Sequence, residues 1–134
     1  MVLRVIEFRL DQRSGVPTYL QLVQQVKHAL RLGILQPGDQ LPTVKEVVGK
    51  LAINPNTVLK AYRELDREGV TEGRRGQGTF VSADQPAHMP GDYSALQSAL
   101  LRWIDRARKA GLDDENIAAL VAATLHAVFF EAAA

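Results

Sequence analysis

The stretch NPNTVLKAYRELDREG, from Asn54 to Gly69, combines the markers of a short helix with a polar, mainly basic outward face. Asn56, Lys60 and Arg63 follow at offsets of zero, four and seven, and Arg67 continues the row at eleven, so one helix face carries them all. An asparagine amide matches the edge of adenine, while Lys or Arg matches guanine or a phosphate. This face predicts recognition of a nucleic acid duplex.

The same residues have a plainer interpretation. Polar side chains on an exposed helix are usually only solvated, and Arg63 and Arg67 could pair with Glu64 and Glu68 at helical spacing. For this helix alone, the two interpretations are evenly matched. We expect Tyr62 to lie in the core rather than on a phosphate.

A second basic feature, GRRGQG at residues 73–78, lies between β-favouring residues and predicts the tip of a β-hairpin. It is not a P-loop, because no Gly-Lys-Ser/Thr follows, and it lacks the third glycine of a dinucleotide fingerprint. Arg74 and Arg75 beside glycines could enter a minor groove, or could simply be solvated arginines on a glycine hairpin. Two adjacent arginines at the apex favour the first interpretation.

The elements before the hairpin predict a helix-turn-helix. Thr43 and Glu46 have the spacing of a capping box, which starts a helix from about residue 44 to 51. Asn54 then caps a second helix that Gly69 ends. A helix-turn-helix followed by a hairpin is a winged helix, in which a major groove ~12 Å wide admits the second helix and the hairpin reaches a minor groove.

Towards the N-terminus, IEFRL at residues 6–10 alternates apolar and charged side chains, which predicts a short strand. A helix is expected from about Pro17 in its first turn to Gly33 as its cap. Its apolar stripe consists of Tyr19, Leu22, Val23, Val26 and Leu30.

Residues 83–92, ADQPAHMPGD, predict a linker between a winged-helix domain at 1–82 and a two-helix domain at 93–134. The second of these helices is expected to begin after Asp113 and to carry Ile117, Leu120, Val121, Thr124, Leu125, Val128 and Phe129 inward. Two helices cannot bury so much apolar surface by themselves, so we predict dimerisation. The residues expected in the shared bundle are Leu96, Leu100, Trp103, Ile104, Leu120, Leu125 and Phe129. The alternative is that the helices pack on their own winged-helix domain and leave a monomer.

Composition narrows the class of protein. The net charge of +1 divides into +4 for residues 1–83, where twelve Lys/Arg face eight Asp/Glu, and −3 for the rest, where four face seven. The excess of positive charge in residues 1–83 is suited to binding a polyanionic partner. There is no cysteine, no apolar run of ~20 residues, and no metal-ligand spacing among His28, His88 and His126. We therefore expect a cytoplasmic protein that is not an enzyme and holds no cofactor or metal.

Four motifs in order, PTYLQLVQQVKHAL, GILQPGDQLPTVKEV, NPNTVLKAYRELDREGV and GRRGQGTFV, resemble the DNA-binding domain of the GntR family of bacterial transcription regulators. The match extends over about Val16 to Ser82, and the short two-helix tail is similar to the YtrA-like branch. The resemblance implies a homodimeric repressor that binds a palindromic DNA operator, often near a transporter operon. Larger relatives carry an effector or aminotransferase domain, for which this chain has no room.

The resemblance also implies contacts with DNA at the residue matching Lys45, at Asn54, Asn56 and Thr57, and at the hairpin tip. Lys45 stands where many relatives carry arginine, and lysine cannot make the planar two-pronged contact. The full set of predicted DNA-binding residues is Thr43, Lys45, Asn54, Asn56, Thr57, Lys60, Arg63, Arg74, Arg75, Gly76, Gln77 and Gly78. A small-molecule effector at the dimer interface, and a winged helix that binds protein instead of DNA, stay open as alternatives.

Overall fold

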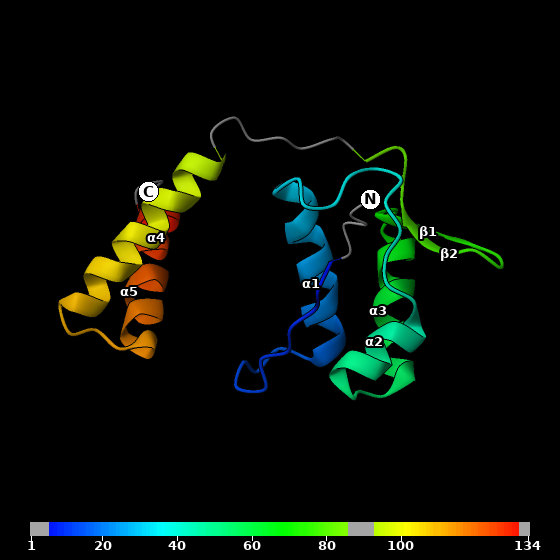
Figure 1. Ribbon diagram of the computed structural model, residues 1–134, viewed down its shortest axis with the longest axis horizontal. Helices are drawn as coiled ribbons and strands as arrows, with labels where there is room; N and C mark the ends of the chain where they lie inside the picture. The colour runs from blue at the N-terminus through cyan, green and yellow to red at the C-terminus, as the bar shows by residue number, and fades with distance from the viewer. Residues whose placement is uncertain (1–5, 86–92, 132–134) are drawn as a thin grey trace. The chain divides into compact units, whose positions relative to one another are not determined.

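The computed structural model describes residues 6–85 and 93–131, and the chain divides into two compact units, residues 1–90 and 91–134. As predicted, the protein is mainly helical with one hairpin (Figure 1). The elements are α1 (Thr18–Arg31), α2 (Val44–Leu51), α3 (Pro55–Arg67), β1 (Thr71–Arg74), β2 (Gly78–Val81), α4 (Tyr93–Lys109), α5 (Asp114–His126) and a π-helical turn η1 (Ala127–Glu131).

The helix ends in the first unit follow the predicted signals. The Thr43 hydroxyl accepts from Glu46 N–H while the Glu46 carboxylate accepts from Thr43 N–H, which completes the capping box of α2. Asn54 caps α3 through its side chain, and Gly69 follows that helix with a φ of 76°. Pro17 lies just outside α1 instead of in its first turn. Local sequence thus determines where the helix-turn-helix begins and ends.

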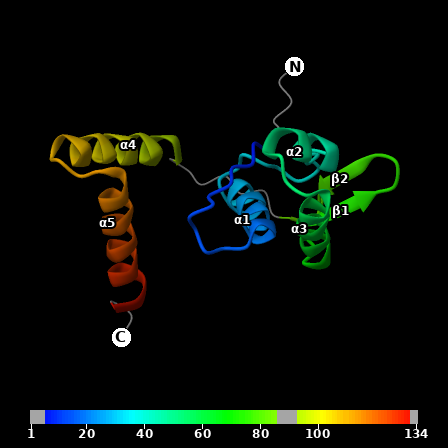
Figure 2. The same ribbon diagram turned by 90° about the horizontal axis from the view of Figure 1, so that it is seen from below.

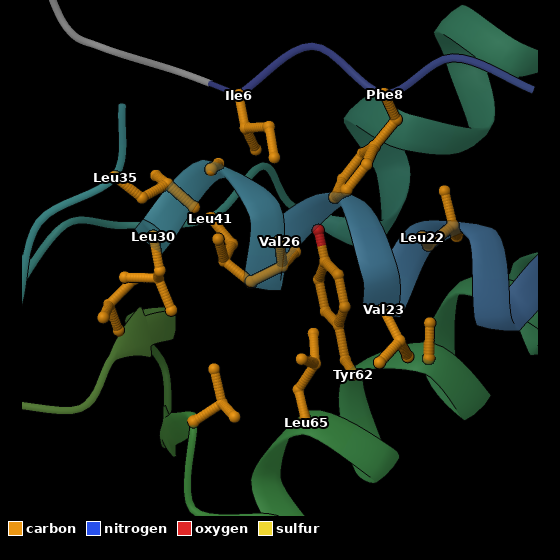
Figure 3. Packing of buried hydrophobic residues seen from close by; sticks show 14 of the residues in the cluster. Ile6, Phe8, Leu22, Val23, Val26, Leu30, Leu35, Leu41, Tyr62 and Leu65 are labelled. Carbon is orange, nitrogen blue, oxygen red and sulfur yellow. The ribbon is translucent and has the colours of Figure 1, made fainter. Parts of the chain in front are cut away.

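One apolar core joins α1 to α3. Leu22 and Val26 of α1 and Val58 and Leu65 of α3 are wholly buried, as the helical spacing predicts. Tyr62 lies among them (Figure 3), and its hydroxyl donates a hydrogen bond to the carbonyl of Pro42 just before α2. Burial, and secondarily the charge of Glu46, raises the pKa of Tyr62. The expectation that Tyr62 is a core residue is confirmed, and its bond fixes α3 against the start of α2.

The strand predicted at residues 6–10 is wrong. Ile6 and Phe8 point towards α1 and are buried, as alternation implies (Figure 3), but the segment pairs with no strand in the described part of the chain. Two side chains of α1 bond its backbone instead. Gln25 accepts from Arg9 N–H (2.8 Å) and donates to Arg9 O, and Gln21 bonds the N–H and carbonyl of Asp11 at 2.8 and 2.9 Å.

These side chains replace a strand because their spacing matches. Gln21 and Gln25 are one helical turn apart, ~6 Å along the axis. The two residues that they bond, Arg9 and Asp11, are separated by ~6.6 Å of extended chain. Each glutamine amide carries both donor and acceptor groups, so it can satisfy the N–H and the carbonyl of one backbone residue as a neighbouring strand would.

The predicted hairpin forms with antiparallel register, Thr71 opposite Val81 and Arg74 opposite Gly78. It projects beyond the helices in both views of this unit (Figures 1 and 2). The connector before α2 bonds the other edge of β2, through Gly38 N–H to Val81 O (3.0 Å) and Leu41 N–H to Thr79 O (2.8 Å). Strand β2 is therefore bonded along both edges, by β1 and by the connector.

The second unit consists of α4, α5 and η1. Asp113 caps α5, as predicted, by accepting from Asn116 N–H at 2.8 Å. The two helices meet near their connecting turn, where Ala107 and Ile117 are buried, and then leave the turn in different directions (Figure 2). The rest of the apolar stripe predicted for this segment is not covered within the single chain: Leu120 and Leu125 of α5 and Val128 and Phe129 of η1 are 44–61% exposed.

Candidate nucleic-acid interface

Of the predicted DNA-binding residues on α2 and α3, three polar side chains are exposed and without partners in the described part of the chain. They are Lys45 in the first turn of α2, Asn56 in the first turn of α3, and Arg63 in its second half. The core stripe Val58, Ala61, Tyr62 and Leu65 occupies the opposite side of α3 and holds that helix in place. These three groups are available for a partner without breaking an internal bond.

Two other basic residues of α3 are engaged within the protein. The Lys60 ammonium lies 4.1 Å from the centre of the Tyr19 ring on α1, a cation–π contact. Arg67 forms a two-pronged ion pair with Glu64, with Arg67 Nε donating at 2.9 Å. The hydrogen bond from Arg67 lowers the pKa of the Glu64 carboxyl and raises that of Arg67. Local charge pairing is therefore the right interpretation for Arg67, while Arg63 has no ion-pair partner among the residues that the structure describes.

Two of the predicted residues, Thr43 and Asn54, act locally at helix starts. The Thr43 hydroxyl both accepts from Glu46 N–H and donates to the Glu46 carboxylate, each at 3.1 Å. The side-chain oxygen Oδ1 of Asn54 accepts from Asn56 N–H at 2.8 Å, which leaves the side-chain nitrogen Nδ2 of Asn54 as the group open to another partner. Thr57 is half-buried.

The two arginines of the hairpin behave differently. The Arg74 guanidinium folds back over the Phe80 ring, 4.2 Å from its centre, and pairs with Glu72 at 2.9 Å. Arg75 is exposed and has no partner among the described residues. A turn closed by Gln77 N–H to Arg74 O (2.9 Å), with Gly76 at a φ of 73°, places Arg75 at the apex.

The start of α2 and the hairpin tip share one shallow hollow of about 550 Å³. Thr43 lies on one side of it and residues 73–79 on the other, including both arginines. The structure thus brings together the predicted tip residues Arg74, Arg75, Gly76, Gln77 and Gly78 with Thr43 of the helix-turn-helix. Lys60 is instead directed to α1.

Sequence reasoning missed three residues. Gln40, in the connector, donates through Nε2 to the carbonyl of Gln77 at the tip (3.0 Å), and no local pattern signals a bond across so many residues. Leu101 and Phe130 are 60% and 66% exposed in the second unit. Their hydrophobicity was visible, but they lie outside the predicted apolar stripes.

Residues 6–85 and 93–131 offer neither a metal site nor a membrane-spanning helix. Within these ranges, His, Asp and Glu side chains form no group of three that could hold a metal ion. The helices in the same ranges are too short or too polar to span a bilayer.

A helix-turn-helix with an unpaired polar ridge, followed by a hairpin with arginine at its apex, defines a winged-helix DNA-binding protein. The family model described as bacterial regulatory proteins, gntR family, matches residues 18–81. The HTH-type transcriptional repressor YtrA of Bacillus subtilis (strain 168) is 40% identical over 110 residues, covering 81% of this chain and 85% of that protein. The chain belongs to the GntR family, which confirms the resemblance inferred from its motifs.

Two further relatives agree. The HTH-type transcriptional regulator Rv1152 of Mycobacterium tuberculosis is 38% identical over 104 residues, 78% of this chain and 82% of that protein. The solved structure of YtrA from Sulfolobus acidocaldarius, a GntR-family transcription factor, is 28% identical with a TM-score of 0.55 over 73% of this chain and 97% of that one. The protein is therefore a sequence-specific DNA-binding transcription regulator and not an enzyme.

Proposed function

We propose that this regulator binds a palindromic operator as a homodimer and represses transcription from it. In each half-site, α3 lies in the major groove with Asn56 reading a base edge, and Lys45 and Arg63 contact phosphates. The wing, which is the hairpin of β1 and β2, places Arg75 in the adjacent minor groove. The observation that carries this assignment is that these four side chains are exposed and unpaired in the described chain, while Lys60, Arg67 and Arg74 have partners.

Dimerisation through the second unit is supported by its exposed apolar surface. Of the predicted interface residues, Leu96, Leu100, Leu120, Leu125 and Phe129 are 44–68% exposed, while Trp103 and Ile104 are half-buried. An exposed surface of this kind marks an interaction site, because apolar area costs free energy in water. Each protomer offers the same face, so a two-fold dimer pairs like with like.

A two-fold dimer accounts for a palindromic operator. Symmetry presents two copies of α3 to two half-sites, whose centres lie one or more helical turns of ~34 Å apart. Repression is extended to this chain from the Bacillus subtilis relative, which is named as a repressor and aligned over most of both chains. The effector site predicted at the dimer interface stays a prediction, as does the linker at residues 83–92, of which 86–92 lie outside the described residues.

The wing contact is tested with Arg75→Ala. Loss of one guanidinium from a phosphate-lined groove should weaken duplex binding and reduce the slope of log K against log salt by about 1. The measurement is fluorescence anisotropy of a labelled operator duplex, selected from random sequence, at several salt concentrations. Arg102→Ala, which removes an exposed arginine of α4, is the charge-matched control and should leave the slope unchanged.

Two results would count against this proposal. If Arg75→Ala and Arg102→Ala behave alike, the wing does not contact DNA. If the unaltered protein binds no duplex but holds a protein partner in a salt-independent way, the winged helix serves as a protein–protein module instead.

A further inference from the structure

The connector before α2 bonds the hairpin through its backbone at two points and, nearest the hairpin tip, through the side chain of Gln40. Alternate carbonyls along β2 and its turn, those of Val81, Thr79 and Gln77, each accept a hydrogen bond from the connector before α2. Gly38 N–H bonds the first and Leu41 N–H the second, at 3.0 and 2.8 Å. The third carbonyl, nearest the tip, is bonded by the Gln40 side chain at 3.0 Å.

The chain itself explains why a side chain is needed at this point. A further backbone hydrogen bond in this series, to the Gln77 carbonyl, would require an N–H from residue 42 or 43. Pro42 has no N–H, and the N–H of Thr43 already faces the Glu46 carboxylate in the capping box. The connector then turns into α2 at Val44. The Gln40 amide therefore supplies the last donor that the tip receives from this side.

Gly78 makes room for that amide. A Cβ at residue 78 would lie 2.8 Å from Gln40 Nε2, closer than real Cβ contacts allow, and the φ of 122° there also disfavours other residues. A side chain at residue 78 would therefore force the Gln40 amide to move from its present position. This gives Gly78, which the sequence placed among the DNA-contacting residues, a role inside the wing.

From this arrangement, we infer that Gln40 is a positioning residue for DNA recognition: it fixes the Gln77 carbonyl and so holds the turn that carries Arg75. The inference rests on the proposed contact between Arg75 and DNA. Fixing the turn before binding lowers the conformational entropy lost when the guanidinium enters a groove. Gln40 itself acts through Arg75 and needs no contact with the duplex.

The test is a double-mutant cycle of Gln40→Met and Arg75→Ala, measured as operator affinity. Methionine keeps the length of the side chain but removes the donor. We expect Gln40→Met alone to weaken binding about three- to tenfold, the range for one lost hydrogen bond, and to have little further effect when Arg75 is already alanine. Gln24→Met, at an exposed glutamine of α1 without a partner in the described chain, is the control and should bind like the unaltered protein.

A second measurement separates positioning from general loss of structure. In Gln40→Met the heteronuclear NOE of the Gly76 amide should fall, while thermal unfolding and the NOEs of α3 stay unchanged. If Arg75→Ala weakens binding but Gln40→Met does not, or if the two effects add, the positioning role is wrong and the wing contact survives. If Arg75→Ala has no effect, the wing contact fails and the inference fails with it.

Discussion

The two units of this protein differ in how they treat their apolar side chains. In the winged-helix unit, residues from α1, the connector, α3 and the hairpin close one core, and Leu22, Leu41, Leu65 and Val81 are at most 2% exposed. In the C-terminal unit, the described residues bury Ala107 and Ile117 but leave Leu96, Phe129 and Phe130 more than 60% exposed. The winged-helix unit buries its apolar side chains within a single chain, whereas the described part of the C-terminal unit leaves many of its own exposed.

This difference separates two tasks. A DNA-reading surface requires a rigid support, because a base contact has value only when its side chain is held in register with the groove. The winged-helix unit supplies that support from its own residues. In the dimer proposed above, the exposed apolar area of the C-terminal unit would join two protomers and so present two DNA-reading units to one operator.

The largest effect should come from removing a core side chain in the winged-helix unit. Leu65→Ala deletes a wholly buried leucine of α3, and we expect it to lower the free energy of unfolding by about 2–5 kcal/mol. The matched change Leu125→Ala, at a residue 46% exposed, should cost far less in a sample dilute enough to be monomeric. Denaturant unfolding of both variants measures the contrast. Equal losses would mean that the second unit hides a core of its own.

A charge placed among the exposed apolar side chains of α4 should affect association of the protomers rather than folding of the chain. Leu100 is 52% exposed on α4, so Leu100→Asp can leave the isolated chain folded while placing a carboxylate in the proposed dimer interface. We expect the dimer dissociation constant to rise at least about a hundredfold, roughly 2.7 kcal/mol, with an unchanged helical circular dichroism spectrum. Sedimentation velocity is the measurement, and Arg102→Ala on the polar side of α4 is the control. A dimer that survives Leu100→Asp would place the interface elsewhere.

The next smaller effect concerns base reading by the winged-helix unit. Asn56→Ala removes an exposed side chain that has no internal partner in the described chain, so protein stability should hardly change. At one operator position, discrimination should fall by about 1–3 kcal/mol. Competition binding with a panel of single-base operator variants detects this change. Uniform weakening across the panel would identify Asn56 as a phosphate contact.

The sequence predicted those features that depend on local signals. The capping box at Thr43, the cap at Asn54 and the glycine after α3 each involve neighbours within a few residues, and all three are confirmed. The stripe that ends in Leu65 was predictable because helical period and burial coincide.

Contacts between distant residues were not predictable in this way. Neither the bond from Gln40 to Gln77 nor the cation–π contact of Lys60 with Tyr19 leaves a pattern in a single sequence. The alternation at residues 6–10 correctly indicated which side chains are buried but not what pairs with the backbone, because glutamine side chains can substitute for a strand.

The smallest of the expected effects tests whether the side chains of Gln21 and Gln25 take the place of a neighbouring strand beside the N-terminal segment. Gln25→Ala removes both bonds to Arg9, and we expect a loss of about 1 kcal/mol in stability, since hydrogen bonds exposed to water contribute little net free energy. Amide hydrogen exchange should become faster at Arg9 and change less at Asp11, which Gln21 still holds. Gln24→Ala on the same helix is the control and should alter neither amide. If Arg9 keeps its protection in Gln25→Ala, the N-terminal segment is held by Ile6 and Phe8 packing alone, and the glutamine pair does not replace a strand.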